Sequence, residues 1–127
     1  MRRFGIAALL LLTVVPAMCR MAAAKGKDHS DQDLSHRNLS NQDLEGDIFE
    51  NADLKGTNLT GARAAGANFC GADLSEARLE GTKLNGADFR KAKLDWLRTS
   101  SDTDLSGANL EKLDFTAKGM YEQTKAE

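Results

Sequence analysis

A large apolar residue recurs every five positions over most of this chain, and this interval limits the possible folds more than any other feature. The central residues run from Leu34 to Leu94 without a break, and the interval resumes from Leu105 to Phe115. All are Leu or Phe except Ala64. A period of five fits neither the 3.6-residue period of an α-helix nor the two-residue period of a β-strand. It therefore indicates a repeat architecture.

The neighbours of each central residue are patterned as well. Ala or Thr usually stands two positions before the centre, Asp or Asn one before it, and Gly two after it, as in "ANFCG", "ADLSE", "NADLKG" and "GANLEK". These segments resemble the pentapeptide repeat family, whose unit is Ala-Asp/Asn-Leu-X-X, and the resemblance covers residues 32–116. It implies an all-β fold, the right-handed quadrilateral β-helix, in which four units make one square coil.

The spacing of the large residues supports this fold independently. If four units make one coil, then Phe49, Phe69 and Phe89 lie one above another and form a column. Two Leu columns are expected beside it. Their members are Leu34, Leu54, Leu74 and Leu94 in one, and Leu39, Leu59 and Leu79 in the other. The interior of such a coil is narrow, which explains the small residue two positions before each centre. We expect about four coils.

Three departures from the pattern refine the expectation. The first four units carry a polar residue where Ala belongs, and we expect these side chains to reach water at the open N-terminal end. They are Gln32, Arg37, Gln42 and Asp47. Ala64 is smaller than the Leu expected between Leu44 and Leu84, so this column should lack side-chain volume at that level. Eleven residues instead of ten separate Leu94 from Leu105, so one unit near residues 95–104 should be irregular and contain a bulge or short loop.

The first residues are typical of a secretory signal peptide. Arg2 and Arg3 precede a continuous apolar run over residues 4–15, which is shorter than the roughly 20 residues of a membrane-spanning helix. Small residues at 22 and 24 suit cleavage after Ala24, and cleavage after Cys19 is the nearest alternative. A retained anchor or a lipid on Cys19 fits these residues less well. We therefore expect an exported protein in a periplasm, a lumen or the medium, with no stable membrane insertion after cleavage.

The expected organisation is a cleavable signal peptide over residues 1–24, a flexible leader over 25–31, the β-helix over 32–116, and a cap or disordered tail over 117–127. Removal of the signal leaves 14 basic against 19 acidic residues, a net charge of −5. The mature chain is thus mildly acidic and has no basic patch of the kind that binds nucleic acid. Whether the protein is a monomer or a dimer stays open.

The sequence offers no catalytic constellation. Its two His residues lie at 29 and 36, and Cys70, the one thiol of the mature chain, is expected on the surface as a free thiol or in an intermolecular disulfide. Asp33, Asp53 and Asp73 should stack into a carboxylate ladder able to bind a hard cation. Asp and Asn in this position, however, also stabilise local turns. We predict no enzyme activity, no cofactor and no metal.

Trp96 is the residue most typical of a binding site. It is the sole Trp, should point outward beside the irregular unit, and is followed by Leu97 and Arg98. An exposed Trp beside Arg has the composition of an interface hot spot; alternatively, Trp96 covers the bulge or the C-terminal edge.

These features leave three candidate functions. The first is a small rigid module that binds an unknown protein partner, with a contact at residues 96–98. The second is a cation-binding or small-ligand-binding protein that uses the Asp ladder. The third comes from the family resemblance, which includes DNA mimics that interact with topoisomerases. That role needs a long, acidic, cytoplasmic rod, whereas the faces of this one mix both charges.

Overall fold

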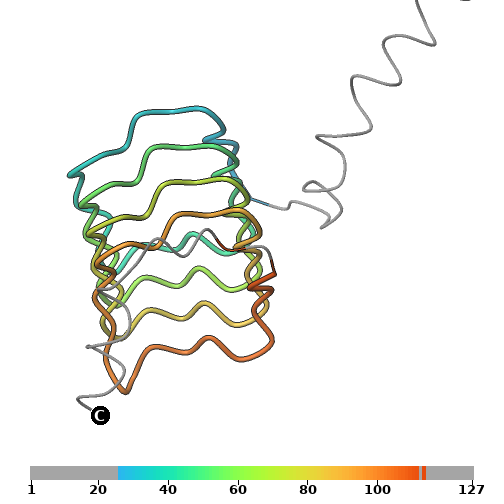
Figure 1. Cartoon of the computed structure of the whole chain (residues 1–127). Coiled ribbons are helices and arrows are strands. Elements are labelled where there is room, and N and C mark those ends of the chain that lie inside the picture. Colours follow the sequence, from blue (N-terminus) through green and yellow to red (C-terminus); the bar gives the residue numbers. More distant parts are fainter. Residues whose placement is uncertain (1–25, 112, 114–127) are drawn as a thin grey trace, which may run out of the picture.

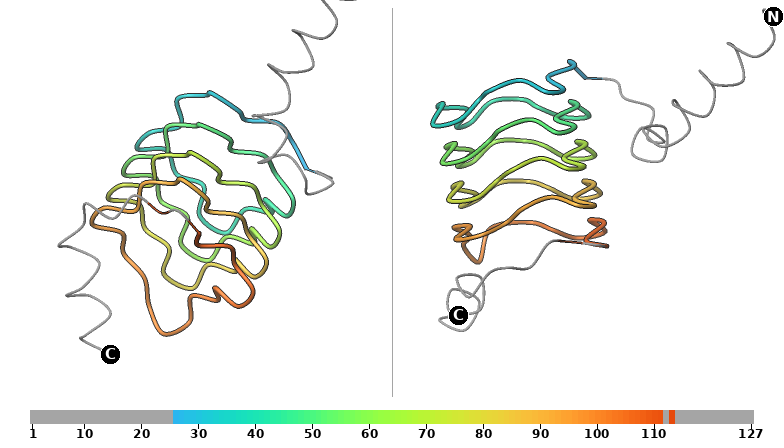
Figure 2. Two further views of the ribbon diagram at one scale, coloured as in Figure 1. Left: turned by 45° about the vertical axis from the view of Figure 1, so that its right-hand side comes forward. Right: turned by 45° about the horizontal axis from the view of Figure 1, so that its top comes forward.

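The computed structural model describes residues 26–111 and 113. This part of the chain winds into a stack of four-sided coils, seen edge-on in Figure 2 and from the side in Figure 1. Parallel bridges join residues 20 positions apart, from Asp28 with Ile48 to Arg78 with Arg98. The bridges are isolated, and the described residues form neither a helix nor an extended strand. The chain is therefore a parallel β-solenoid whose pairing is confined to the middle of each side.

Each side of a coil is bonded to the coils before and after it. Asp53 shows the pattern: its N–H donates to the carbonyl of Gln32 at 2.9 Å, and the next N–H, of Leu54, donates to the carbonyl of Asp73 at 2.8 Å. Alternation of this kind satisfies the backbone groups of a side in both directions. The predicted stacking of positions 20 apart is thus confirmed.

A tight turn forms every corner. The carbonyl of a central residue accepts the N–H three positions later, as Leu54 accepts from Thr57 at 3.1 Å. The third residue of the turn has a positive φ, as a type II turn requires, which is why Gly recurs there. Among the described residues, eight such corners hold Gly. Seven hold another residue: Asp31, His36, Asn41, Asn51, Glu76, Lys91 and Trp96.

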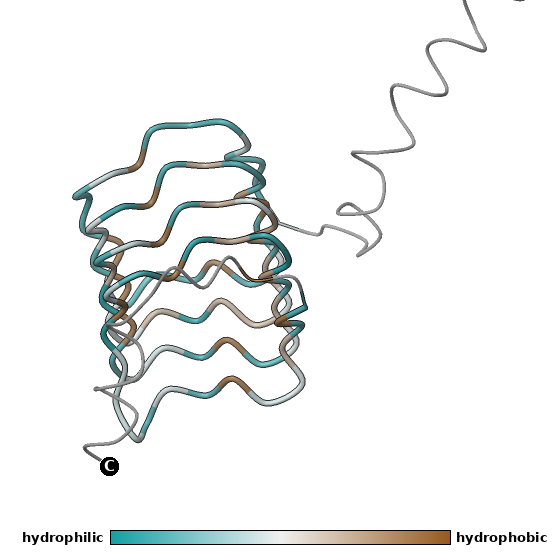
Figure 3. Ribbon diagram, in the orientation of Figure 1, coloured by the Kyte–Doolittle hydropathy of each residue, from teal (hydrophilic) through white to brown (hydrophobic). Residues whose placement is uncertain are grey.

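The core is a set of columns along the axis. Phe49, Phe69 and Phe89 stack with ring centroids 5.0 Å apart, close to the spacing of about 4.8 Å between neighbouring strands. The Leu columns lie at the other sides, and the fully buried Ala residues two positions before each centre leave room for them. In Figure 3 the hydrophobic segments recur at matching places in successive coils. The predicted Phe column is confirmed.

The solenoid begins earlier than its sequence pattern suggested. Asp28 bridges Ile48, and the ring of His29 stacks on Phe49 at 5.0 Å. His29 thus occupies a central position one unit before Leu34, where a polar aromatic ring replaces the expected Leu or Phe. The prediction of a flexible leader over residues 25–31 is therefore wrong from residue 26 onward, because this segment is hydrogen-bonded into the first coil.

The polar residues of the first units divide into two groups. Gln32, Arg37 and Gln42 are exposed at the N-terminal end, as expected. Asp47 is only 5% exposed. Its Oδ1 accepts the N–H of Lys27 at 2.7 Å, and its Oδ2 lies 3.4 Å from Nε2 of His29. A carboxylate is accommodated in this inward position because the first unit supplies its partners.

The irregular unit lies where it was predicted. The bridges join positions 20 apart up to Arg78 with Arg98, and positions 21 apart for Lys83 with Asp104. One extra residue is therefore inserted within residues 99–103, and the columns resume one position later. The predicted signal peptide at 1–24 and the tail at 117–127 lie outside the described residues.

Candidate interaction site

Trp96 occupies a corner next to the irregular unit. Its side chain is 59% exposed, the largest exposed fraction among the big apolar residues recorded for the described chain. Its φ of 58° is left-handed, a conformation that is uncommon for a bulky residue. The indole therefore projects from the rod without contributing to its core.

The two residues after Trp96 point in different directions. Leu97 is 4% exposed and belongs to the core cluster, whereas Arg98 is exposed. Leu97 stands two positions before the expected centre, where Ala is usual, and the centre itself is the small Thr99. Large and small residues are thus exchanged in this unit. Leu97 was wrongly included in the predicted contact site, since its side chain is used by the core.

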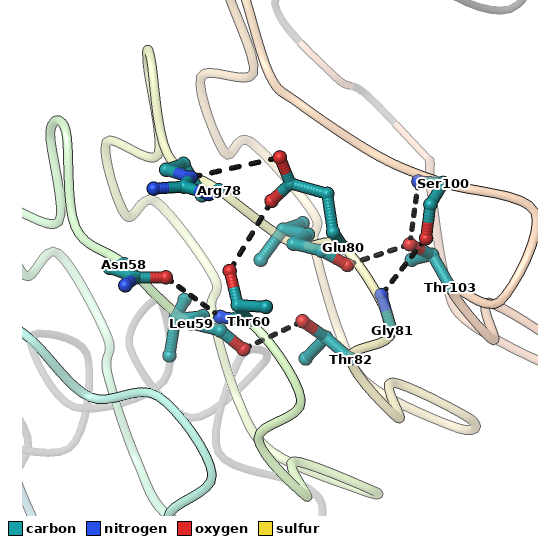
Figure 4. A network of polar contacts seen from close by, with 10 residues as sticks. Asn58, Leu59, Thr60, Arg78, Glu80, Gly81, Thr82, Ser100 and Thr103 are labelled. Carbon is teal, nitrogen blue, oxygen red and sulfur yellow. Dashed lines mark hydrogen bonds and ion pairs between the residues drawn. The ribbon is translucent and has the colours of Figure 1, made fainter.

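Side chains replace a missing backbone pairing at the inserted residue. The N–H of Gly81 donates to Oγ of Ser100 at 3.0 Å, where a regular coil would offer a carbonyl. The N–H of Ser100 donates to Oγ1 of Thr103 at 3.0 Å, and that hydroxyl donates to the carbonyl of Leu79 at 2.6 Å. Figure 4 shows this network. The segment beside Trp96 is therefore fixed to the coil before it.

The Arg side chains next to this segment form part of the same surface. Arg98 is directly below Arg78, to which it is bridged through the backbone. Nε of Arg78 lies 3.7 Å from a carboxylate oxygen of Glu80. The surface around the indole thus combines one large apolar group with exposed guanidinium groups.

The Asp ladder exists, but one oxygen of each carboxylate already accepts a local hydrogen bond. Asp33, Asp53 and Asp73 are bridged in sequence. In each, Oδ1 accepts the N–H of the residue two positions later at 3.0 Å. Among the described residues, no group of three or more His, Cys, Asp or Glu is arranged to hold a metal ion. The carboxylates thus stabilise the local turns, as Asx-type contacts do.

Cys70 differs from expectation. It directly follows a central Phe, so an outward and exposed thiol was predicted, but it is 1% exposed. It is disulfide-bonded, and the described residues contain no free cysteine. The prediction of an exposed thiol is therefore wrong.

Comparison with known families agrees with this geometry. A family model described as pentapeptide repeats matches residues 33–69 and 65–96, with 8 copies of the unit. The two matches together cover half of the chain. The chain belongs to the pentapeptide repeat family. Members of this family fold as right-handed quadrilateral β-helices, which is the architecture built above from the bridges and corners.

Solved pentapeptide repeat proteins share the fold. Rfr23 from the cyanobacterium Cyanothece 51142 is 32% identical, with a TM-score of 0.64 over 68% of this chain and 58% of Rfr23. HetL from Nostoc sp. strain PCC 7120 is 30% identical, with a TM-score of 0.57 over 68% of this chain and 44% of HetL. The chain thus spans about half the length of these relatives. No curated protein matches it.

QnrB1, a plasmid-mediated fluoroquinolone resistance protein, is more distant. It is 22% identical, with a TM-score of 0.40 over 69% of this chain and 50% of QnrB1. At this level of similarity, nothing about its activity carries over to the present chain.

The N-terminal end of this pentapeptide repeat rod holds a cavity of about 100 Å³. Its apolar lining comes from Leu34, Leu39, Leu44 and Phe49, and Lys27, His29 and Asp47 are among the polar residues that line it. Sequence reasoning missed the role of His29 and Asp47 in closing this end. A five-residue count extended backward from Leu34 would have placed His29 at a centre.

Within the described part of the chain, no helix has the length and apolar character needed to cross a membrane.

Proposed function

We propose that this chain is an exported pentapeptide repeat protein that serves as a small, rigid protein-binding module without catalytic activity. Its rod has about four coils, and its contact with a protein partner is formed by Trp96 and Arg98. The observation that carries the proposal is the 59% exposure of Trp96 at a left-handed corner.

The energetics of Trp96 favour a role in binding over a role in folding. An indole exposed to this extent gains little from burial, and a bulky side chain at positive φ costs free energy of about 1–2 kcal/mol. Trp and Arg are the residues most enriched among interface hot spots, where desolvation of the indole provides affinity. The alternative, that Trp96 covers the bulge, would require a buried indole.

The scaffold suits a module of this kind. Backbone hydrogen bonds hold each side to both neighbouring coils, and the network of Ser100 and Thr103 fixes the segment after Trp96. A preformed contact surface avoids the entropic cost of ordering on binding. HetL is described as involved in heterocyst differentiation regulation, a role that a non-catalytic binding module could serve.

Export is proposed from the sequence alone. The basic pair at Arg2 and Arg3 and the apolar run that follows have the layout of a signal peptide. A fusion of residues 1–40 to a reporter that is active only after export tests this part. Activity of the fusion supports export, and an inactive reporter retained in the cytoplasm contradicts it.

Affinity capture tests the binding role. The exported protein is used as bait with the envelope or lumen fraction of its own source, beside Trp96→Ala and Glu76→Ala. Glu76 occupies the same corner one coil earlier, also at positive φ, so it controls for the loss of a corner side chain. We expect wild type and Glu76→Ala to enrich the same protein and Trp96→Ala to lose it. Enrichment by all three, or by none, would contradict the assigned contact.

A further inference from the structure

Two adjacent sides of the rod carry opposite charges in rows along its axis. The residue immediately before each centre points away from the core, and such residues are bridged from one coil to the next. These outward rows, in order along the rod, are Asp33, Asp53, Asp73 and Lys93 on one side, called the Asp face, and Asn38, Asn58, Arg78 and Arg98 on the next side, called the Arg face. The Asp face is thus acidic over its first three coils, and the Arg face is basic over its last two.

The guanidinium groups of the Arg face have no acidic neighbour in their row. Arg78 and Arg98 are both exposed and are bridged to each other, and the uncharged Asn58 precedes them. Nε of Arg78 lies 3.7 Å from Glu80, as Figure 4 shows. Within the described chain, however, the guanidinium of Arg98 has no ion pair. Like charges on neighbouring strands repel each other, so an anionic surface over this face would relieve the repulsion.

The side of the rod that follows the Arg face shows the contrast. Its outward row also holds two neighbouring cations, Arg63 and Lys83, but Asp43 and Asp104 stand at the two ends of that row. Arg63 donates a hydrogen bond to Asp43 at 2.9 Å. That row is therefore balanced within one chain, whereas the Arg face is not.

The carboxylates of the Asp face can accept further contacts. Asp33 and Asp53 are exposed, and only Oδ1 of each takes part in the local hydrogen bonds. Their Oδ2 atoms accept no hydrogen bond within the described chain. The two residues are one coil apart, about 4.8 Å, as Arg78 and Arg98 are. A second copy of this chain therefore presents carboxylates at the interval of the guanidinium pair.

We propose that the Arg face binds the Asp face of a second copy of this chain, with the two rods antiparallel. Arg98 then contacts Asp33 of the other copy, and Arg78 contacts its Asp53. The inference rests on the proposed function in one respect, that Arg98 is a contact residue, and it names a second copy as a protein bound there.

The antiparallel orientation follows from the geometry of the coil. Half a turn about the strand direction reverses both the rod axis and the outward direction of a face, but leaves the strand direction unchanged. In antiparallel rods, each outward row therefore faces the equivalent row of the other copy, with the fourth coil on the first and the third on the second. Glu80 then faces Lys55, and no like charges face each other in the rows on either side of the centres.

Other arrangements of the same two faces fit less well. In parallel rods, the residue after a centre faces the residue before a centre at the same level, which sets Glu80 against Asp73. A shift of the antiparallel rods by one coil keeps two Arg–Asp contacts, now with Asp53 and Asp73. It loses one coil of overlap and the contact of Glu80 with Lys55. Charge complementarity thus favours the unshifted antiparallel pair.

The contact joins two different faces and is therefore heterologous. A bound rod still presents its own Arg face to a third copy, and the third rod regains the orientation of the first at a displaced position. The row is thus open and not a closed ring. One face measures about 19 Å by 10 Å, less than the roughly 800 Å² per partner of a standard interface. Each contact should therefore be weak and sensitive to salt.

Sedimentation velocity of the protein isolated from its own source tests self-association. At an ionic strength of about 0.05 M, we expect the mean mass to rise with concentration beyond that of a dimer, and at about 0.5 M to return to that of a monomer. A monomer at low ionic strength would overturn the inference. The proposed function would then still be decided separately, by capture of a different protein through Trp96.

Charge-reversed variants identify the two faces. Arg78→Asp with Arg98→Asp should be monomeric alone, and so should Asp33→Lys with Asp53→Lys, because each variant sets like charges against each other. An equimolar mixture should associate as the wild type does, since every contact between the two variants again pairs opposite charges. The outward rows already hold Asp104 and Lys93, so these substitutions are compatible with the coil. A monomeric mixture, or association of either variant alone, would refute the proposed contact.

A third variant tests the register. Asp73→Lys places the new charge opposite the neutral Asn58 of the other copy, so it should associate nearly as the wild type does. Asp33→Lys places the same charge opposite Arg98 and should weaken association. Loss of association in Asp73→Lys and not in Asp33→Lys would overturn the unshifted register.

Discussion

At the scale of single residues, the corner position two after each centre is the most demanding in the molecule. All fifteen corners recorded in the described chain have a positive φ, between 56° and 71°. Glycine adopts this conformation without strain, and Asn, Asp and His adopt it more readily than other side chains. Glu76, Lys91 and Trp96 have no such advantage. A substitution at a corner therefore acts mainly through the backbone.

Replacement of a corner glycine isolates this backbone term. A Cβ on Gly86 would meet nothing within 4 Å, so Gly86→Ala adds left-handed strain without a collision. We expect its free energy of unfolding to fall by about 1–2 kcal/mol. Glu76→Ala, at a corner that already has a Cβ, should stay within about 0.5 kcal/mol of wild type. Urea denaturation measures both, and equal effects in the two variants would argue against the strain.

Local hydrogen bonds set the acidity of outward carboxylates that stand one residue before a centre. The hydroxyl of Ser35 donates to Asp33 at 2.6 Å, and its N–H donates at 3.0 Å. These two bonds, the hydroxyl first, lower the pKa of Asp33 below its ordinary value of 3.8. The corresponding bonds from Ser106 lower the pKa of Asp104.

Ser35→Ala should raise the pKa of Asp33 toward 3.8, because the strongest stabilising bond to the carboxylate is removed. A lowered folded-state pKa stabilises the fold above the unfolded pKa, and this stabilisation is lost as the pH falls through the folded value. The variant should therefore lose less stability between neutral pH and the acid range. NMR titration of the carboxyl carbons checks this, with Asp104 as the internal reference. An unshifted Asp33 would mean that the hydroxyl is unimportant.

At the scale of the structural element, three consecutive residues beside the irregular unit have different roles: two are exposed and available for binding, and the one between them packs in the core. Trp96 projects into solvent, Leu97 fills the core, and Arg98 is exposed again. Thr99 is too small to fill the place of a central Leu, so Leu97 supplies the missing volume from the position where Ala is usual. The insertion that follows is held by Ser100 and Thr103.

This division predicts opposite effects for neighbouring substitutions. Leu97→Ala should lower the free energy of unfolding by about 2–5 kcal/mol, since Thr99 cannot refill the space. Trp96→Ala should change it by less than about 0.5 kcal/mol, because little of the indole is buried. Thermal and chemical denaturation of the two variants compare them directly. A strongly destabilised Trp96→Ala would show that the indole covers the bulge and would weaken the proposed contact.

The position of each element in the repeat decided what could be predicted from the sequence. The Phe column and the inserted residue followed from spacing alone, because a five-residue register leaves one place for each centre. The first unit was missed because His29 is not a typical centre, and its role depends on Asp47 and Phe49 from the next coil. The inward direction of Leu97 was hidden by the exchange of large and small residues with Thr99. The burial of Cys70 could not be predicted, since the repeat itself leaves that position open.

At the scale of the whole molecule, the rod is a sum of coils that contact only their neighbours along the axis. Its stability depends on whether equivalent columns continue from one coil to the next. Phe89 stacks under Phe69, and Thr82 donates to the carbonyl of Leu59 at 2.7 Å. The ring stacking recurs one coil earlier between Phe49 and Phe69, and the hydroxyl contact recurs one coil later, where Thr103 donates to the carbonyl of Leu79. The whole coil, and not the single repeat unit, is therefore the interchangeable part.

Deletion of one full coil should therefore be tolerated better than deletion of half a coil. Removal of residues 74–93 places Leu94 where Leu74 stood and brings Thr103 to the carbonyl of Leu59, as Thr82 is now. We expect cooperative unfolding with an m-value lower by roughly a quarter, in proportion to the surface buried. Removal of residues 74–83 keeps the five-residue interval but sets Phe89 beneath Leu59 and Thr99 beneath Phe69, which overpacks one column and empties the other. The shorter deletion should thus give the less stable protein, as measured by circular dichroism during urea denaturation. If the half-coil deletion is as stable as the full-coil deletion, then the columns are not what specifies the stacking.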